Sequence, residues 1–92
     1  MLSRKHLLLE KPHSLGGVQR IYRFKSGKGL SVVNSPRLHS YDYAWEAAVI
    51  TDVQDNGEFA SIDYSTPLTE DVEVFMSDDE ANAFIELASN TI

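Results

Sequence analysis

Residues 18–34 read V-Q-R-I-Y-R-F-K-S-G-K-G-L-S-V-V-N, and this stretch decides the fold. Its first part is rich in β-branched and aromatic residues, with Val18, Tyr22 and Phe24 on one face of an extended chain. Residues 29–34 form a second apolar segment, and the short glycine-bearing run K-S-G-K separates the two as a hairpin loop does. The stretch therefore predicts a β-hairpin.

The lysines and glycines of this hairpin do not match a phosphate-binding loop. A Walker loop places G-x-x-x-x-G-K-[ST] between a strand and a helix, so that backbone amides and the helix end meet the phosphates. Here Gly27 and Gly29 flank Lys28 between two strands, and no helix follows. We interpret the stretch as a turn with solvated lysines.

A second hairpin is expected in residues 43–64. Tyr43, Trp45, Ala47 and Val49 alternate on one face of a run that is apolar enough for a central strand. The letters Q-D-N-G come next, and Asn-Gly is the preferred pair for a type I′ turn because both central residues need positive φ. Residues 58–64 then return as the fourth strand.

The C-terminal residues predict an amphipathic helix. Ser77 is followed by three acids, the last of which is Glu80, and this spacing is a capping box at a helix N-terminus. The apolar stripe of the helix comprises Ala81, Phe84, Ile85 and Ala88. The preceding residues 72–76 fit either a short edge strand or an irregular connection.

These elements predict an α+β fold: a four-stranded antiparallel sheet made of two hairpins, with a C-terminal helix packed on one face. A chain of 92 residues is long enough for one small core. Residues 1–15 show no clear period and are expected to be an N-terminal arm or a loosely attached edge segment. Residues 16–92 are expected to be a single domain.

The composition argues against disulfides, thiolate metal sites, a signal peptide and a membrane span. The chain has no cysteine, so it has neither disulfides nor thiolate metal ligands. The leucine run at residues 7–9 is far shorter than the apolar core of a signal peptide or a membrane span. We expect a soluble protein without membrane partners, located in the cytoplasm.

The charges are divided between the two parts of the chain. All eight lysines and arginines lie at or before Arg37, where Glu10 is the one acid, whereas thirteen acids and no base follow from Leu38 onward. Such asymmetry indicates a charged partner. The alternative is that the two parts pair within the fold, with basic strands beside acidic ones.

No arrangement of residues predicts catalysis, a cofactor or a metal. His6, His13 and His39 lack the spacing that places imidazoles on one metal ion, and Asp42 and Asp63 have no nucleophile or second carboxylate at a diagnostic distance. We therefore expect a protein that is not an enzyme and has no cofactor.

Aromatic residues on or beside the strands suggest a nucleic-acid alternative, since open sheet faces stack bases. Core packing is their more common role, and the acidic strands would repel phosphate. Nucleic-acid binding is therefore confined, as an alternative, to the basic first hairpin.

Several short motifs of the sequence, taken in their order along the chain, resemble those of a family of small hypothetical proteins encoded by bacteriophages and prophages. Its pattern runs G-G-V, R-F, G-x-G, S-V-V, S-Y-G, W-E-x-A-V and Y-D-T-P-I-T-D-D-V, followed by a short acidic helix. The matching residues are Gly16–Val18, Arg23-Phe24, Gly27 with Gly29, Ser31–Val33, Ser40-Tyr41, Trp45-Glu46 with Ala48-Val49, and residues 64–72. Asp42 and Ser65 depart from the pattern. The resemblance implies a phage origin and action in a bacterial host, and it implies no catalytic residue.

These observations predict a small acidic phage protein that binds, and modulates or inhibits, a host protein. A nucleic-acid-handling defence factor, such as a CRISPR or restriction component, is one such partner, because its basic groove attracts carboxylates. The alternatives are a self-associating structural or accessory protein and a weak nucleic-acid binder. The candidate partner-binding residues are Asp52, Asp55, Glu58, Glu70, Asp71, Glu73, Asp78, Asp79, Tyr41 and Tyr43.

Overall fold

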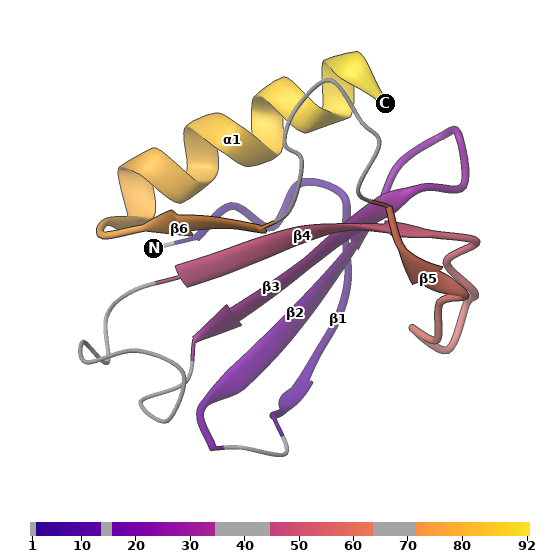
Figure 1. Ribbon diagram of the computed structural model, residues 1–92, viewed down its shortest axis with the longest axis horizontal. Coiled ribbons are helices and arrows are strands. Elements are labelled where there is room, and N and C mark those ends of the chain that lie inside the picture. The colour runs from indigo at the N-terminus through magenta and orange to yellow at the C-terminus, as the bar shows by residue number, and fades with distance from the viewer. Residues whose placement is uncertain (1, 14–15, 35–44, 64–71) are drawn as a thin grey trace.

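A computed structural model describes residues 2–13, 16–34, 45–63 and 72–92 of the chain. In these residues a helix lies across one face of an antiparallel sheet of six strands (Figure 1). The elements are β1 (Leu7–Pro12), β2 (Val18–Arg23), β3 (Gly29–Asn34), β4 (Trp45–Thr51), β5 (Ser61–Ile62), β6 (Val72–Phe75) and α1 (Asp78–Thr91). The α+β class and the C-terminal helix are confirmed, whereas the sheet has six strands and not four.

The sheet follows the order of the sequence from β1 to β5. Strand β6 joins it by pairing with the first half of β4, and β5 pairs with the last residues of the same strand. Strands β5 and β6 therefore share one side of β4, while β3 occupies the other side. The predicted fourth strand, residues 58–64, is reduced to the two residues of β5, and the ambiguous segment 72–76 forms the edge strand β6.

The two hairpins have turns of the same type, each closed by the same pattern of backbone hydrogen bonds. In the first, the Gly27 amide donates to the Phe24 carbonyl at 3.1 Å, and the Phe24 amide donates to the Lys28 carbonyl at 2.9 Å. Residues 54–58 repeat this pattern at 2.9 and 2.8 Å, with Gly57 in the place of Gly27. The two glycines have φ of +89° and +87°, a conformation that a residue with a Cβ adopts only with strain.

The type I′ turn predicted from Asn56-Gly57 does not form. Among the described residues other than glycine, only His6 and Asp52 have positive φ, so Asn56 lacks the conformation that this turn requires. The reversal comes one residue earlier, and Gly57 follows it as a bulge. A Cβ on Gly57 would lie 2.4 Å from Leu9 Cδ2, so any other residue at this position would also have to displace the leucine side chain.

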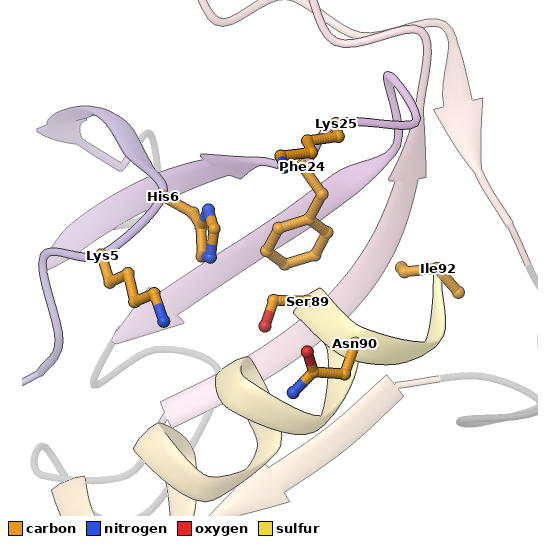
Figure 2. Close-up of a pocket in the computed structure, with 7 residues that line it drawn as sticks. All are labelled: Lys5, His6, Phe24, Lys25, Ser89, Asn90 and Ile92. Atoms are coloured by element: carbon orange, nitrogen blue, oxygen red, sulfur yellow. The ribbon is translucent and has the colours of Figure 1, made fainter.

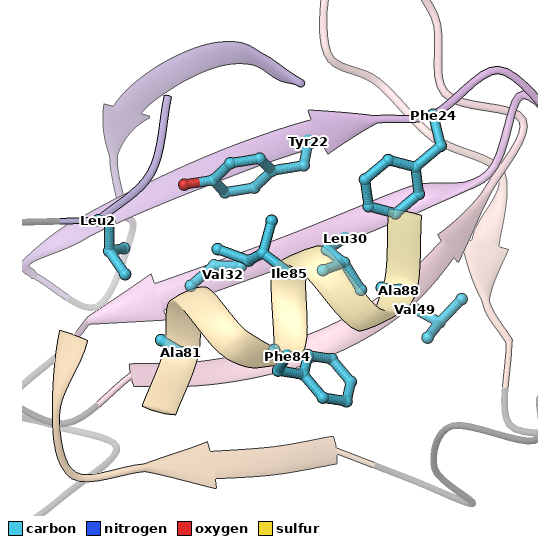
Figure 3. Close-up of a cluster of buried hydrophobic side chains, with 11 residues drawn as sticks. Leu2, Tyr22, Phe24, Leu30, Val32, Val49, Ala81, Phe84, Ile85 and Ala88 are labelled. Atoms are coloured by element: carbon cyan, nitrogen blue, oxygen red, sulfur yellow. The ribbon is translucent and has the colours of Figure 1, made fainter. Parts of the chain in front are cut away.

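The main core lies between the helix and the sheet (Figure 3). The predicted stripe of α1 is buried against side chains from the three central strands, which include Tyr22, Leu30 and Val49, each fully buried. Because Trp45, Ala47 and Val49 alternate along β4, they all reach this side of the sheet, as the sequence pattern predicts. The buried residues of this cluster are Leu2, Tyr22, Phe24, Leu30, Val32, Ala47, Val49, Ala81, Phe84, Ile85 and Ala88.

A smaller core lies on the opposite face of the sheet. Ile21 and Ile50 are fully buried there and pack with Val53 of the β4–β5 connection. Leu9 and Phe59 add partial cover from the edge strand and from the same connection. The sheet is therefore packed on both faces at the end where the two hairpin turns lie.

Residues 2–13, predicted to belong to an arm or a loosely attached edge segment, are attached to the domain. Their strand β1 pairs with β2 from Leu7 to Pro12, and Leu2 is buried beneath the helix. The Ser3 amide donates to Asn82 Oδ1 of α1, and the Ser3 carbonyl accepts from the Tyr22 hydroxyl, both at 2.7 Å. Burial raises the pKa of Tyr22, so its hydroxyl remains a donor to this carbonyl throughout the neutral range.

The helix begins as the capping box predicts. Ser77 Oγ accepts from the Glu80 amide at 3.2 Å, while Glu80 Oε2 accepts from the Met76 amide at 3.3 Å, one residue before the usual partner. No helix in the described residues is both long and apolar enough to cross a membrane.

The cap and the buried ring of α1 should contribute unequally to stability. Ser77→Ala removes one hydrogen bond at an exposed helix end and should lower the free energy of unfolding by about 1 kcal/mol. Phe84→Ala leaves a cavity beneath the helix and should cost about 3–5 kcal/mol. Urea denaturation measures both, and small, equal losses would show that the helix is not docked on the sheet.

Candidate functional site

The acidic residues predicted to bind a partner fall into two groups in the structure. Asp52, Asp55 and Glu58 are exposed in the connection after β4. Glu73 lies on β6, and Asp78 and Asp79 lie in the first turn of α1. The other candidates, Glu70, Asp71, Tyr41 and Tyr43, lie outside the described residues.

The two groups are at opposite ends of strand β4. The strand begins at Trp45, whose indole N–H donates to Asp78 Oδ1 at 2.8 Å, and this contact fixes the start of the helix at that end. It ends at Thr51, directly before Asp52. Figure 1 shows the helix N-terminus and the β4–β5 connection on opposite sides of the molecule. The described acids therefore form two separate surfaces.

Ion pairs connect the basic first part of the chain to the acidic second part. Arg23 at the end of β2 pairs with Asp55, and Lys28 before β3 pairs with Asp63 at 2.9 Å. Lys5 approaches Glu86 of the helix at 3.8 Å. The hairpin turns bring the Arg23–Asp55 and Lys28–Asp63 pairs together, because β2 ends and β3 begins beside the start of the β4–β5 connection. Basic residues of the first part of the chain thus pair with acidic residues of the second part within the fold. This pairing is the alternative to a charged partner that the charge pattern of the sequence left open.

The same ion pairs reduce the basic character of the first hairpin. Arg23 and Lys28 are neutralised by carboxylates, and Arg20 pairs with Glu10 of the neighbouring strand while its guanidinium lies 6.0 Å from the centre of the Trp45 ring. Phosphate binding by a protein depends on cations that are available to replace counterions. Among the cations of the first hairpin, Lys25 is the one without a carboxylate partner in the described residues, so the hairpin offers little of the free positive charge that nucleic-acid binding needs.

Exposed apolar side chains mark the edge formed by β5 and β6. Val74 is 48% exposed, Met76 41% and Ile62 36%, and these are three of the four large apolar side chains that are exposed in the described part of the chain. Val74 is opposite Glu46 in the register and Ile62 is opposite Ile50, which places both on the sheet face away from α1. We call these three residues, with Glu73, Asp79 and Glu80, the β5–β6 edge surface.

A shallow hollow of about 210 Å³ adjoins this surface on the same sheet face. Gln19 Nε2 donates to Ser31 Oγ at 2.8 Å in its floor, beside Val33 and Ala48, and Ile62 forms part of its rim. Sequence reasoning missed this feature because Gln19 and Ser31 come from different strands and become neighbours only through the hairpin register.

The described residues contain no group of three or more His, Cys, Asp or Glu side chains that could hold a metal ion. No family model matches the chain, and neither a curated protein nor a solved structure matches it. The resemblance to phage proteins therefore stays a prediction.

The ion pairs should differ in strength according to their exposure. The Asp63 side chain is 13% exposed and that of Lys28 is 41% exposed, whereas the Asp55 side chain is 97% exposed. A double-mutant cycle with Lys28→Met and Asp63→Asn should give a coupling of about 1 kcal/mol, because burial weakens solvent screening.

The matched cycle with Arg23→Met and Asp55→Asn should give no measurable coupling, since water screens that pair. Both cycles are measured by urea denaturation at low salt. A larger coupling for the Arg23–Asp55 pair than for the Lys28–Asp63 pair would contradict this ranking.

Proposed function

We propose that this protein is a non-enzymatic binding protein that attaches to another protein through the β5–β6 edge surface. The observation that carries the proposal is the exposure of Val74 and Met76, 48% and 41%, beside the start of β4, with Ile62, 36% exposed, farther along the same side of that strand. Scattered exposed apolar residues need no explanation, whereas a group beside polar residues is typical of an interaction site.

The backbone of β6 supports the same use. Within the described residues β6 pairs with β4 alone, so it is an edge strand with a row of amides and carbonyls on its outer side. An extended segment of a partner can add to such an edge, and its main chain then supplies the affinity. Glu73 on this strand makes it less prone to pair with the same edge of a second copy, because like charges would face each other.

Charge defines the kind of partner. Glu73 precedes Val74 on β6, Asp79 and Glu80 follow Met76 in the first turn of α1, and no lysine or arginine follows Arg37 in the sequence. A basic partner would be steered toward this surface by electrostatic attraction, and apolar contacts would then hold it. Proteins that handle nucleic acids carry such basic grooves.

The resemblance to phage proteins gives the context for this proposal. It makes a host protein that handles nucleic acid, such as a defence nuclease, the first partner class to test. In that setting the acidic edge would compete with nucleic acid for the basic groove and so inhibit the host protein.

The test is affinity capture from a bacterial lysate with matched baits, followed by quantitative mass spectrometry. The baits are the wild type, the double variant Ile62→Ser/Val74→Ser, and Leu87→Ser as the control. Leu87 is 55% exposed on α1, so the control removes an even more exposed apolar side chain elsewhere.

A specific partner should be retained by the wild type and by Leu87→Ser, and the double variant should bind it at least about tenfold more weakly. Binding should also weaken as salt rises from 0.1 to 1 M, because the screening length falls from about 10 Å to about 3 Å. Equal capture by all three baits would refute the edge surface. Sedimentation of the wild-type protein alone shows whether it self-associates, and so separates capture of a second copy from capture of a host protein.

A further inference from the structure

A cavity of about 340 Å³ lies at the other end of the molecule from the β6 strand, between the N-terminal segment and the last turn of the helix (Figure 2). Lys5 and His6 form one wall, and Phe24 and Lys25 extend it from the end of β2. Ser89, Asn90 and Ile92 form the facing wall. Three segments that are distant in the sequence thus meet around one space.

One wall of the cavity is cationic. Lys25 has no carboxylate partner among the described residues, and Lys5 has only the distant contact to Glu86, in which both side chains are more than half exposed. The imidazole of His6 supplies an N–H donor in either protonation state. Three donors, two of them positively charged, therefore line one side of the space.

The conformation of His6 is unusual. Its φ is +67°, in the left-handed region, which is sparsely populated by residues with a Cβ. The His6 carbonyl accepts from the Arg23 amide at 3.0 Å, and the imidazole stands edge-on to the Phe24 ring at 5.3 Å between ring centres. These two contacts hold the strained residue with its ring at the cavity, and such strain is typical of functional positions.

The facing wall offers hydrogen-bond acceptors. Ser89 Oγ donates its proton to the Glu86 carbonyl at 2.7 Å, so its lone pairs remain for a ligand. Asn90 Nδ2 donates to the same carbonyl at 3.1 Å, which leaves its side-chain oxygen as an acceptor. Phe24 and Ile92 provide apolar surface between the cationic wall and these acceptors.

We propose that this cavity binds a small hydroxylated phosphate monoester, a molecule of the size and chemistry of a sugar phosphate. The phosphate would lie against Lys5, Lys25 and the imidazole N–H of His6, and the positive charges of the two lysines suit a dianion. The hydroxyl groups of the ligand would donate to Ser89 and Asn90. The volume is at the lower end of the range of about 300–1,000 Å³ for small-molecule sites, which fits one sugar ring with its phosphate.

A purely structural role for the lysines makes a different prediction. The negative end of the helix dipole also lies at this cavity, and α1 has no basic residue in its last turn. Lys5 and Lys25 could compensate that dipole without any ligand. In that case Lys25→Gln would lower the melting temperature and leave ligand binding unchanged.

The experiment is a titration of the ¹⁵N-labelled protein with glucose 6-phosphate, inorganic phosphate and glucuronate, followed by amide chemical shifts. The variants are Lys25→Gln and His6→Asn, since asparagine tolerates positive φ better than most residues and the backbone is kept. Lys11→Gln is the matched control, because Lys11 is exposed on β1 and outside the cavity.

Glucose 6-phosphate should shift the amides of residues 5–6, 24–25 and 89–92, and it should bind more tightly than inorganic phosphate or glucuronate. Lys25→Gln and His6→Asn should each weaken it about tenfold, whereas Lys11→Gln should not. Absence of shifts, equal affinity for all three probes, or an equal loss in the Lys11 variant would overturn the proposal. So would a Lys25 variant that melts earlier and binds as well as the wild type.

Discussion

Strand β3 needs apolar cover on both of its faces, because Leu30 and Val32 point to one side and Ser31 and Val33 to the other, and all four are buried. Helix α1 covers the first side, whereas on the second side Ser31 and Val33 line the shallow hollow and are shielded by the side chains around it, which include Gln19 and Phe59. Close packing also limits the residues at the start of the strand: a Cβ on Gly29 would lie 1.8 Å from the Tyr22 carbonyl oxygen. The other strands and the helix are arranged around β3, and their outer sides form the surface of the protein.

The position of β3 explains where binding surfaces can occur. The apolar residues of its neighbours β2 and β4 are buried or partly buried, so the large apolar side chains that are exposed in the described residues are found at the β5–β6 edge and on the outer side of the helix. The hairpin turns bring basic and acidic residues together at one end, where Arg23 and Lys28 find carboxylate partners. The acids of β6 and the helix start lie at the other end, beside Val74. The edge surface and the basic cavity are consequently separate sites, and each can be tested without disturbing the other.

The sequence predicted the features that depend on local pattern. The first hairpin, the capping box at Ser77 and the buried stripe of the helix follow from residue spacing, and the structure has them. Strand β1 was missed because a bulge between Leu7 and Leu9 breaks the alternation that would have indicated a strand. The ion pairs and the cavity were missed because they depend on tertiary contacts; His6 and Asn90, for example, become neighbours only when β1 and the helix are both in place. The sequence identified candidate acidic residues for partner binding, but it could not show that the fold would place them at opposite ends of strand β4.

The central claim is that the helix and the buried central strand β3 form one cooperative unit. Native-state hydrogen exchange tests it most directly, because each amide reports the free energy of the opening that exposes it. The account predicts that the slowest amides of β3 and those of the buried stripe of α1, around Phe84 and Ile85, exchange with the same free energy as global unfolding. Exchange of the helix at a free energy lower by about 2 kcal/mol or more, with β3 still protected, would contradict it.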